Sequence, residues 1–364
     1  MVLTGVVLVF AAPGPLDPPA GPVSSTYKSL AEVEPRIAIT AANTPGDSDS
    51  LYKITQAGSY YLAGNLSGVS GKMGIEVAAS DVTIDLNGFT VQGVAGTLDG
   101  ISCTVANSTS ISVLNGTVRG WGLDGIDLAS AFVMAGRIER VVAEANSVDG
   151  IKGGTQFVIA GCSARGNGGN GLQGFSACTF DGCTAEYNTL GGFSGLGCEV
   201  DNCMSLYNGG AGFIFGDDSV CRGCTASFNG TEGFTFTTGS TISDCSAGRN
   251  KASGFSIGSR CIITGCTASV NAVNAASGAN IKIYSSDNLV QGNNCTGGLR
   301  GIQVQLAGNI IIRNVCSGNT TNWDIVAGNA LAPIVNATTN GSAVIGNTYA
   351  GNLGSSDPNA NYTY

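Results

Sequence analysis

The chain has 364 residues, a formal net charge of −9, no histidine and only 11% charged residues. This composition argues against nucleic-acid binding, because a basic surface supplies most of that affinity. The 56 glycines and a repeat that continues without a linker favour one extended domain over two or three globular ones.

The N-terminal segment Met1–Ala12 is apolar and resembles the end of a secretory signal peptide that lacks its basic region. It is too short to span a membrane. We therefore expect a secreted or cell-surface protein, with the periplasm as an alternative location. Residues 1–22 are predicted to be this leader and a Pro/Gly-rich linker. Residues 23–73 are predicted to form an N-terminal segment and cap, in which Tyr52–Leu66 contributes two strands that cover the open end.

Residues 74–329 carry an internal repeat of about 20 to 26 residues. An apolar residue that usually follows a glycine marks each copy. These landmarks are Ile75, Ile101, Ile126, Ile151, Leu172, Phe193, Phe213, Phe234, Phe255, Ile281, Ile302 and Ile325. Cysteines keep the same phase at Cys162, Cys183, Cys203, Cys224, Cys245 and Cys266, each followed five residues later by an asparagine.

A unit of this length is too short for two helices, and its apolar residues alternate as they do in strands. Three short strands separated by turns account for one copy. The sequence therefore predicts an all-β, single-domain parallel β-helix of about twelve rungs, with like residues stacked at about 4.8 Å. Residues 330–364 lose the period and are predicted to form a C-terminal cap and tail.

The thirteen cysteines are best explained as buried free thiols. Cysteines stacked on neighbouring coils would be one strand spacing apart, which is longer than the separation of about 3.8 Å that a disulfide prefers between Cβ atoms. Cys221 and Cys224 form the single CxxC pair, but the phase of the core already explains both positions, so we expect no zinc site there.

Candidate functional residues lie where the first rungs are four or five residues longer. Asp99, Asp124 and Asp149 precede the landmark glycine on three successive rungs, so their carboxylates should stack. Carboxylates this close either raise a pKa or hold a cation such as Ca²⁺. The simpler alternative is that Asp-Gly is a favoured turn pair.

Four further residues lie beside this column in the sequence. Asp127 and Lys152 point outward on adjacent rungs, where a plain cross-strand ion pair is the alternative. Arg119 and Trp121 occupy the long loop, and Trp121 could offer a platform to a sugar ring or fold over the edge of the core. The Thr, Ser and Gln side chains of later rungs are typical of a solvated face.

The pattern Asn-x-x-x-Gly-[Phe/Ile], with Asp85–Phe89, Ile54–Leu62 and Val118–Gly122, resembles right-handed parallel β-helices of the pectin-lyase-like superfamily. Within it, the chain is most similar to the branch with short carbohydrate-binding and sugar-hydrolase repeats and to uncharacterised secreted bacterial proteins. The resemblance covers roughly residues 50–350.

The resemblance implies a polysaccharide partner. By position, Asp99, Asp124 and Asp149 match acidic Ca²⁺ ligands, and Arg119 or Lys152 matches a base. Asp124 and Asp149 would be catalytic with them, while Trp121 and Asp127 would bind substrate. No diagnostic catalytic motif is matched, and one fold carries many activities.

Two functions stay open at this point. One is interaction with extracellular polysaccharide, either as a Ca²⁺-dependent lyase, as a glycosidase or without catalysis. The other is a non-catalytic surface or structural protein, such as an adhesin, a sheath or a filament subunit that associates through its terminal segments.

Overall fold

The computed structural model describes residues 34–336 and 355–364, so the predicted leader and linker lie outside the described residues. Residues up to Arg36 form a separate unit, of which only residues 34–36 are described, with Glu34 and Arg36 joined by an ion pair of 2.8 Å. The second unit, Ile37–Tyr364, contains strands and no helix among its described residues.

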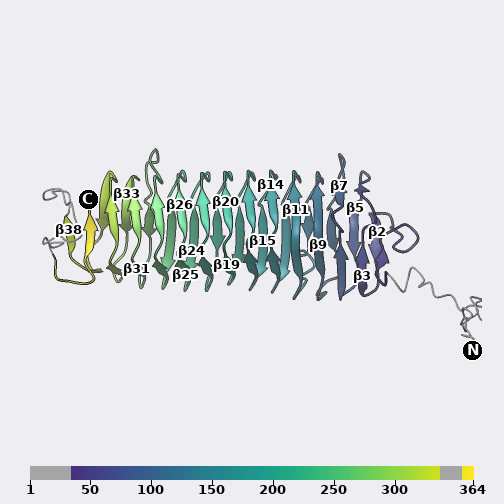
Figure 1. The fold of residues 1–364 in the computed structure, drawn as a ribbon, viewed down its shortest axis with the longest axis horizontal. Coiled ribbons are helices and arrows are strands. Elements are labelled where there is room, and N and C mark those ends of the chain that lie inside the picture. Colours follow the sequence, from purple (N-terminus) through teal and green to yellow (C-terminus); the bar gives the residue numbers. More distant parts are fainter. Residues whose placement is uncertain (1–33, 337–354) are drawn as a thin grey trace, which may run out of the picture. The chain divides into compact units, whose positions relative to one another are not determined.

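This unit is a right-handed parallel β-helix of about 14 turns (Figure 1). One sheet of 13 parallel strands, here called sheet B, contributes one strand to each coil. Its strands are β2 (Ser50–Ile54), β5 (Met73–Val77), β8 (Ile101–Cys103), β10 (Ile126–Asp127), β12 (Ile151–Thr155), β15 (Leu172–Ser176), β18 (Phe193–Leu196), β21 (Phe213–Phe215), β24 (Phe234–Thr238), β27 (Phe255–Ser259), β30 (Ile281–Ile283), β33 (Arg300–Val304) and β36 (Thr321–Ile325).

The other sheet, sheet A, contains two strand columns that β9 (Ser112–Arg119) and β11 (Arg137–Glu144) join. The first column comprises β1 (Ile37–Ala38), β3 (Gly58–Tyr61), β6 (Val82–Asp85), β13 (Val158–Ala160), β16 (Thr179–Asp181), β19 (Glu199–Asp201), β22 (Val220–Arg222), β25 (Thr241–Ser243), β28 (Ile262–Thr264), β31 (Leu289–Gln291), β34 (Ile310–Ile312) and β37 (Ala330–Leu331). The second comprises β4 (Leu66–Ser67), β7 (Thr90–Gln92), β14 (Ser163–Arg165), β17 (Thr184–Glu186), β20 (Met204–Leu206), β23 (Thr225–Ser227), β26 (Ser246–Gly248), β29 (Thr267–Ser269), β32 (Asn294–Thr296), β35 (Val315–Ser317), β38 (Ile334–Asn336) and β39 (Asn361–Thr363).

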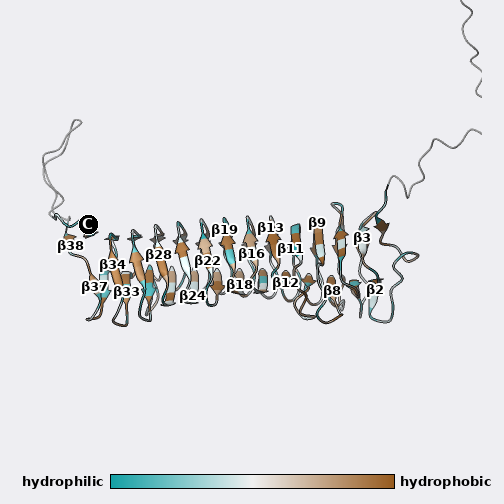
Figure 2. Cartoon of the chain, turned by 90° about the horizontal axis from the view of Figure 1, so that it is seen from below, coloured by the Kyte–Doolittle hydropathy of each residue, from teal (hydrophilic) through white to brown (hydrophobic). Residues whose placement is uncertain are grey.

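The landmark residues from Ile75 to Ile302 pair in register as the period predicts, with Ile126 opposite Ile151 and Phe213 opposite Phe234. The last predicted landmark is wrong, because Ile302 pairs with Trp323 and Ile325 pairs with Val304. Hydrophobic residues recur along the strands of every coil (Figure 2). The landmark glycine is required by close approach: a Cβ on Gly212 would lie 2.6 Å from the carbonyl oxygen of Gly233 on the next coil. Glycine therefore avoids a clash between coils at this position, although the coil of Ile281 carries Asn280 there.

The stack begins earlier than predicted. β2 pairs in parallel with β5, and β3 with β6, so Ser50–Tyr61 forms a coil of its own and does not close the end. The preceding residues turn back on it, with Pro45 bridging antiparallel to Tyr52. This extra coil, together with the strands after residue 329, explains why the count exceeds twelve.

Side-chain ladders fill the interior. The rings of Phe193, Phe213, Phe234 and Phe255 stack with centroids 4.7 to 4.8 Å apart. All thirteen cysteines are buried and free, as predicted.

The asparagine column is buried as well. Asn167 donates from Nδ2 to Oδ1 of Asn188 at 2.9 Å and to the carbonyl oxygen of Ala143 at 3.1 Å. The same pattern recurs on the following coils, which satisfies the amides without water.

Candidate functional site

A hollow of about 630 Å³ opens on the outer face of sheet B, over β8, β10 and β12. The strands present Ser102, Asp127 and Lys152 in register to it. Asp99 and Asp124 reach it from the turns that precede β8 and β10. Four of the seven predicted site residues, Asp99, Asp124, Asp127 and Lys152, therefore line the hollow, and a fifth, Asp149, contacts Lys152 beside it.

The three aspartates form a column that repeats one backbone contact. Oδ1 of Asp99 accepts the N–H of Asp124 at 2.9 Å, and Oδ1 of Asp124 accepts the N–H of Asp149 at 2.7 Å. Asp149 in turn accepts the N–H of Asn170, whose own side-chain oxygen accepts the N–H of Gly191. One carboxylate oxygen of each aspartate thus holds the next coil in place, in line with the turn interpretation.

Lys152 lies between two members of this column. Its Nζ is 2.8 Å from Oδ2 of Asp124 and 3.1 Å from Oδ2 of Asp149. Burial lowers the pKa of Lys152, but the hydrogen bonds and negative charges of Asp124 and Asp149 outweigh it and raise the pKa above its usual value. Lys152 is therefore an ammonium at neutral pH, and the predicted role as a base has no support from this geometry.

Asp127 is buried and does not pair with Lys152. Its Oδ1 accepts the N–H groups of Ala129 and Ser130, both at 3.0 Å, and its Oδ2 accepts the hydroxyl of Ser130. The cross-strand ion pair that its register allowed is absent from the ion pairs of the described residues.

Asp99 has the freest carboxyl group of the column. The described residues give its Oδ2 no hydrogen bond or ion pair. Burial raises the pKa of Asp99 to about 6, and the negative charges of Asp124 and Asp127 add to the shift. A carboxyl with such a pKa exchanges a proton readily in mildly acidic to neutral solution.

Two predictions about the long loop are wrong. Trp121 is only 1% exposed, and its Nε1 donates to the carbonyl oxygen of Val91 at 3.0 Å. Its indole ring fills the space that Gly74 and Gly100 leave, so it offers no platform to a sugar. Arg119 ends β9 in sheet A, where its side chain contacts Gln92 and Glu144, and it does not line the hollow.

The sequence interpretation missed two exposed aromatic residues beside the hollow. Phe132 follows Ala131, which lines it, and contacts Phe175 edge to face with centroids 6.0 Å apart. Phe175 also lines a second hollow of about 410 Å³ farther along sheet B, with Gln173 and Thr235. The signal was available, because phenylalanine occupies an outward position in Gly174-Phe175-Ser176.

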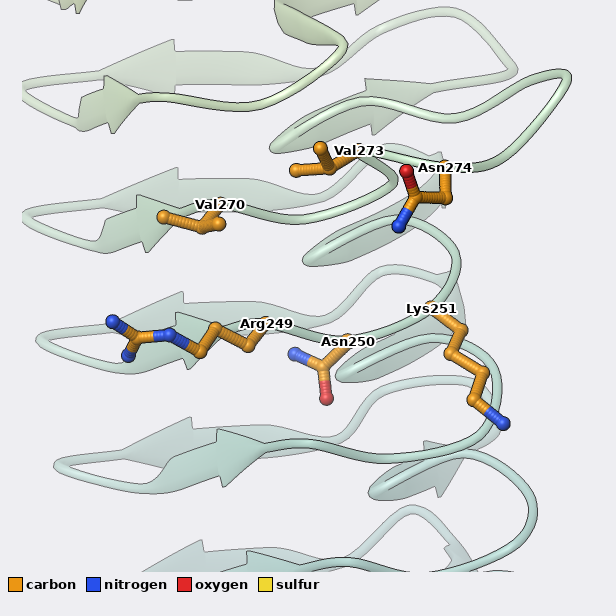
Figure 3. A pocket seen from close by; sticks show the side chains of 6 residues that line it. All are labelled: Arg249, Asn250, Lys251, Val270, Val273 and Asn274. Carbon is orange, nitrogen blue, oxygen red and sulfur yellow. The ribbon is translucent and has the colours of Figure 1, made fainter.

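A third hollow, of about 450 Å³, lies beside a turn that follows β26 (Figure 3). Val270, Val273 and Asn274 line it from one coil, and Arg249 and Lys251 from the neighbouring coil. The side chains of Arg249 and Lys251 point away from each other. No carboxylate lines this hollow, so the acidic hollow of sheet B is the better candidate for proton-transfer chemistry.

The predicted calcium site does not fit the geometry of the aspartate column. Within the described residues, Asp99, Asp124 and Asp149 are not a set whose carboxylate oxygens all lie within 4.8 Å of one another. The ammonium of Lys152 occupies the position between Asp124 and Asp149 that a cation would take. The geometry of the column therefore gives no support to a calcium-dependent step, and calcium binding there stays a prediction.

No family model and no curated protein matches the sequence. Solved structures do match the fold. The A-module of mannuronan C-5 epimerase AlgE4 from Azotobacter vinelandii aligns over 75% of this chain and 90% of that one, with a TM-score of 0.56 at 17% identity. The protein is a right-handed parallel β-helix.

Two further structures share this β-helix fold. The A-module of mannuronan C-5 epimerase AlgE6 from the same organism covers 84% of this chain and 90% of its own, with a TM-score of 0.52 at 16% identity. The N-terminal fragment of bacteriophage Phi29 gene product 12 covers 75% of this chain and 61% of its own, with a TM-score of 0.55 at 13% identity. Identities this low establish the parallel β-helix architecture alone.

Proposed function

We propose that this protein binds an extracellular polysaccharide along the outer face of sheet B. The observation that carries the proposal is the hollow of about 630 Å³ in which carboxyl, ammonium and hydroxyl groups from three successive coils meet. Such groups can donate hydrogen bonds to sugar hydroxyls and accept hydrogen bonds from them. The epimerase modules that share the fold are named for a polysaccharide, mannuronan, which supports the choice of ligand class.

A polymer suits the site better than a single sugar. β12 pairs directly with β15, so the acidic hollow continues along the same sheet into the hollow of Gln173 and Thr235. Phe132 and Phe175 lie between the two hollows with exposed rings, which can pack against the apolar faces of sugars. From β8 to β24 the track crosses seven strands, or about 29 Å.

If the protein is an enzyme, Asp99 is the residue that we propose for proton transfer. Its raised pKa suits a general acid or base near pH 6. Asp124 and Asp149 are ion-paired with Lys152, and Arg119 lies elsewhere, so the lyase roles expected for these residues lose their support.

A secreted or cell-surface location belongs to the same proposal. Among the described residues, no helix is both long and apolar enough to cross a membrane.

The test is a panel of neutral and acidic polysaccharides and their oligosaccharides, measured for binding and for degradation. We expect Phe175→Ala to weaken binding of a long chain about fivefold or more, since stacking contacts of this kind contribute about 1 kcal/mol or more. Asp99→Asn should abolish degradation if any occurs, with binding retained. The control is Lys282→Met, which changes a charge farther along sheet B.

Binding that is equal in Phe175→Ala, Asp99→Asn and Lys282→Met would place the ligand elsewhere. A panel without any bound glycan would remove the proposal.

One observation favours the alternative of a self-associating surface protein. Tyr187, Tyr207 and Phe228 are exposed and stack with centroids 4.8 to 5.1 Å apart, although all three have a positive φ of 55 to 58°. Bulky residues rarely adopt this backbone conformation, so a favourable interaction of these rings must offset the strain.

Light scattering across a range of protein concentrations tests self-association. Association that Tyr207→Ser abolishes would support this function. The terminal segments that were predicted to mediate it lie largely outside the described residues.

A further inference from the structure

Three carboxylates converge near the N-terminal end of sheet B, away from the predicted aspartate column. Asp47 and Asp49 lie in the turn before β2, and Glu76 lies in β5. One carboxylate oxygen from each lies within 4.8 Å of the other two. Because calcium–oxygen distances are about 2.4 Å, oxygens up to about 4.8 Å apart can share one ion. We propose that Asp47, Asp49 and Glu76 form a divalent-cation site that prefers Ca²⁺.

Glu76 provides the observation that separates this cluster from an ordinary acidic surface. The residue is only 3% exposed, and its Oε2 has no hydrogen-bond partner among the described residues. Its other oxygen, Oε1, accepts the hydroxyl of Thr104 at 2.6 Å and pairs with Lys53 at 2.8 Å. A buried carboxylate oxygen without a partner is costly, and a bound cation would satisfy it.

The two lysines near the cluster, Lys53 and Lys72, do not prevent a cation from binding. Lys53 pairs with Asp47 at 2.7 Å as well as with Glu76, and its partly exposed side chain can move out toward solvent. Lys72 donates to the carbonyl oxygens of Asp47 and Ser50 and makes no ion pair with the three carboxylates. In the absence of an ion, Lys53 therefore takes the place of the cation, and the two compete.

Ca²⁺ suits this site better than Mg²⁺. Calcium accepts six to eight oxygens in a flexible arrangement, whereas magnesium demands a near-ideal octahedron. Asp47 and Asp49 supply carboxylates from an exposed turn, while Glu76 supplies one from a strand. An ion bound here would link this turn to the second coil across β2.

The experiment is isothermal titration of the full chain with CaCl₂ and, separately, MgCl₂, after removal of metals by a chelator. We expect one Ca²⁺ per chain, with Mg²⁺ bound at least about tenfold more weakly. Glu76→Gln keeps the shape of the side chain and should lower the affinity about tenfold or more. Asp49→Asn provides a second variant on the exposed turn in case Glu76→Gln impairs folding.

Lys53→Met gives the most diagnostic result, since removing the competing ammonium should raise the affinity for Ca²⁺ about threefold or more. Thermal unfolding should shift upward with Ca²⁺ in the wild type and not in Glu76→Gln. The matched control is Asp124→Asn, which should leave the calcium affinity unchanged.

Three results would overturn the inference: no calcium binding at millimolar concentration, weaker binding in Lys53→Met, or a loss in Asp124→Asn that Glu76→Gln does not share. The last result would place the ion at the aspartate column. None of these results bears on glycan binding in the hollow of sheet B, so the two proposals fail separately.

Discussion

At the scale of the residue, one backbone contact is shared by side chains with different chemistry. Asp99, Asp124, Asp149 and Asn170 each accept the N–H of the next coil. Asparagine fulfils this contact as well as aspartate does, so the contact alone does not explain the three charges. What distinguishes Asp99 is that it makes no ion pair with Lys152, whereas Asp124 and Asp149 do. Burial raises the pKa of Asp99 to about 6, and it raises the pKa of Asp124 as well.

The stability of the protein should therefore depend on pH through Asp99. Between about pH 4, where the unfolded carboxyl titrates, and pH 6, the folded state holds a proton that the unfolded state has lost. The free energy of unfolding should fall as pH rises through this window. In Asp99→Asn the fall should be smaller by of order 1 kcal/mol, allowing for solvent screening. Urea denaturation at several pH values measures it, and parallel curves for both proteins would contradict the assignment.

Lys152 should be a stability residue. Lys152→Met leaves Asp124 and Asp149 with buried charges and no counterion, which should cost roughly 3 kcal/mol. Lys282→Met, at the equivalent outward position of β30, removes a lysine without an ion pair in the described part of the chain and should cost under about 0.5 kcal/mol. Denaturant midpoints at neutral pH compare the two. Equal costs would show that the ion pairs contribute nothing.

The sequence was informative about where site residues lie along the stack, and less so about what each contacts. Steps of 25 residues placed Asp99, Asp124 and Asp149 on successive coils correctly. The spacing could not show that Lys152 reaches back to Asp124, because a lysine side chain spans a coil. Trp121 was misjudged because its burial depends on space beside Gly74 and Gly100, more than 20 residues away. Glu76 lies in the outward column of the repeat, but Asp47 and Asp49 lie outside it, so the period could not show that the three carboxylates meet.

At the scale of the element, hydrogen-bond ladders between coils hold each coil in place more than contacts within that coil do. Asn229 shows the arrangement: its Nδ2 donates to the carbonyl oxygen of Ser205 and to Asn250, and its Oδ1 accepts from Asn208. Every one of these groups is buried, so each bond links two coils and excludes water.

Asn229→Ala should therefore lower the free energy of unfolding by more than most single polar substitutions do. It leaves at least two buried groups without a partner, at about 1 to 3 kcal/mol each. Asn274→Ala removes an exposed asparagine from a nearby loop and should change stability by less than about 0.5 kcal/mol. Guanidinium denaturation measures both, and a small effect at Asn229 would mean that water replaces the lost amide.

These ladders are why the fold could be predicted from the sequence. A column of like residues requires the same phase on every coil. Residues equivalent to Cys183, Asn188 and Phe193 therefore recur together in the sequence and reveal the period. The ends lack this requirement. The strand Ser50–Ile54 carries neither the cysteine nor the asparagine, and the prediction accordingly placed it in a cap when it belongs to the stack.

At the scale of the whole described stack, each coil contacts mainly its two neighbours, so damage should stay local. Phe234→Ala removes a ring that stacks on Phe213 and Phe255 and should cost about 4 kcal/mol. Hydrogen exchange should accelerate over residues 193–281 and stay unchanged over residues 75–126. Uniform acceleration along the chain would show that the stack opens as one cooperative unit.

The burial of Trp121 has a practical consequence. The chain contains two tryptophans, and the other, Trp323, lies in the last strand of sheet B. Each indole therefore reports by fluorescence on one region of the rod, and replacing either by phenylalanine isolates the other signal. The order in which the two emission bands shift to the red during denaturation would reveal from which side the spiral unwinds.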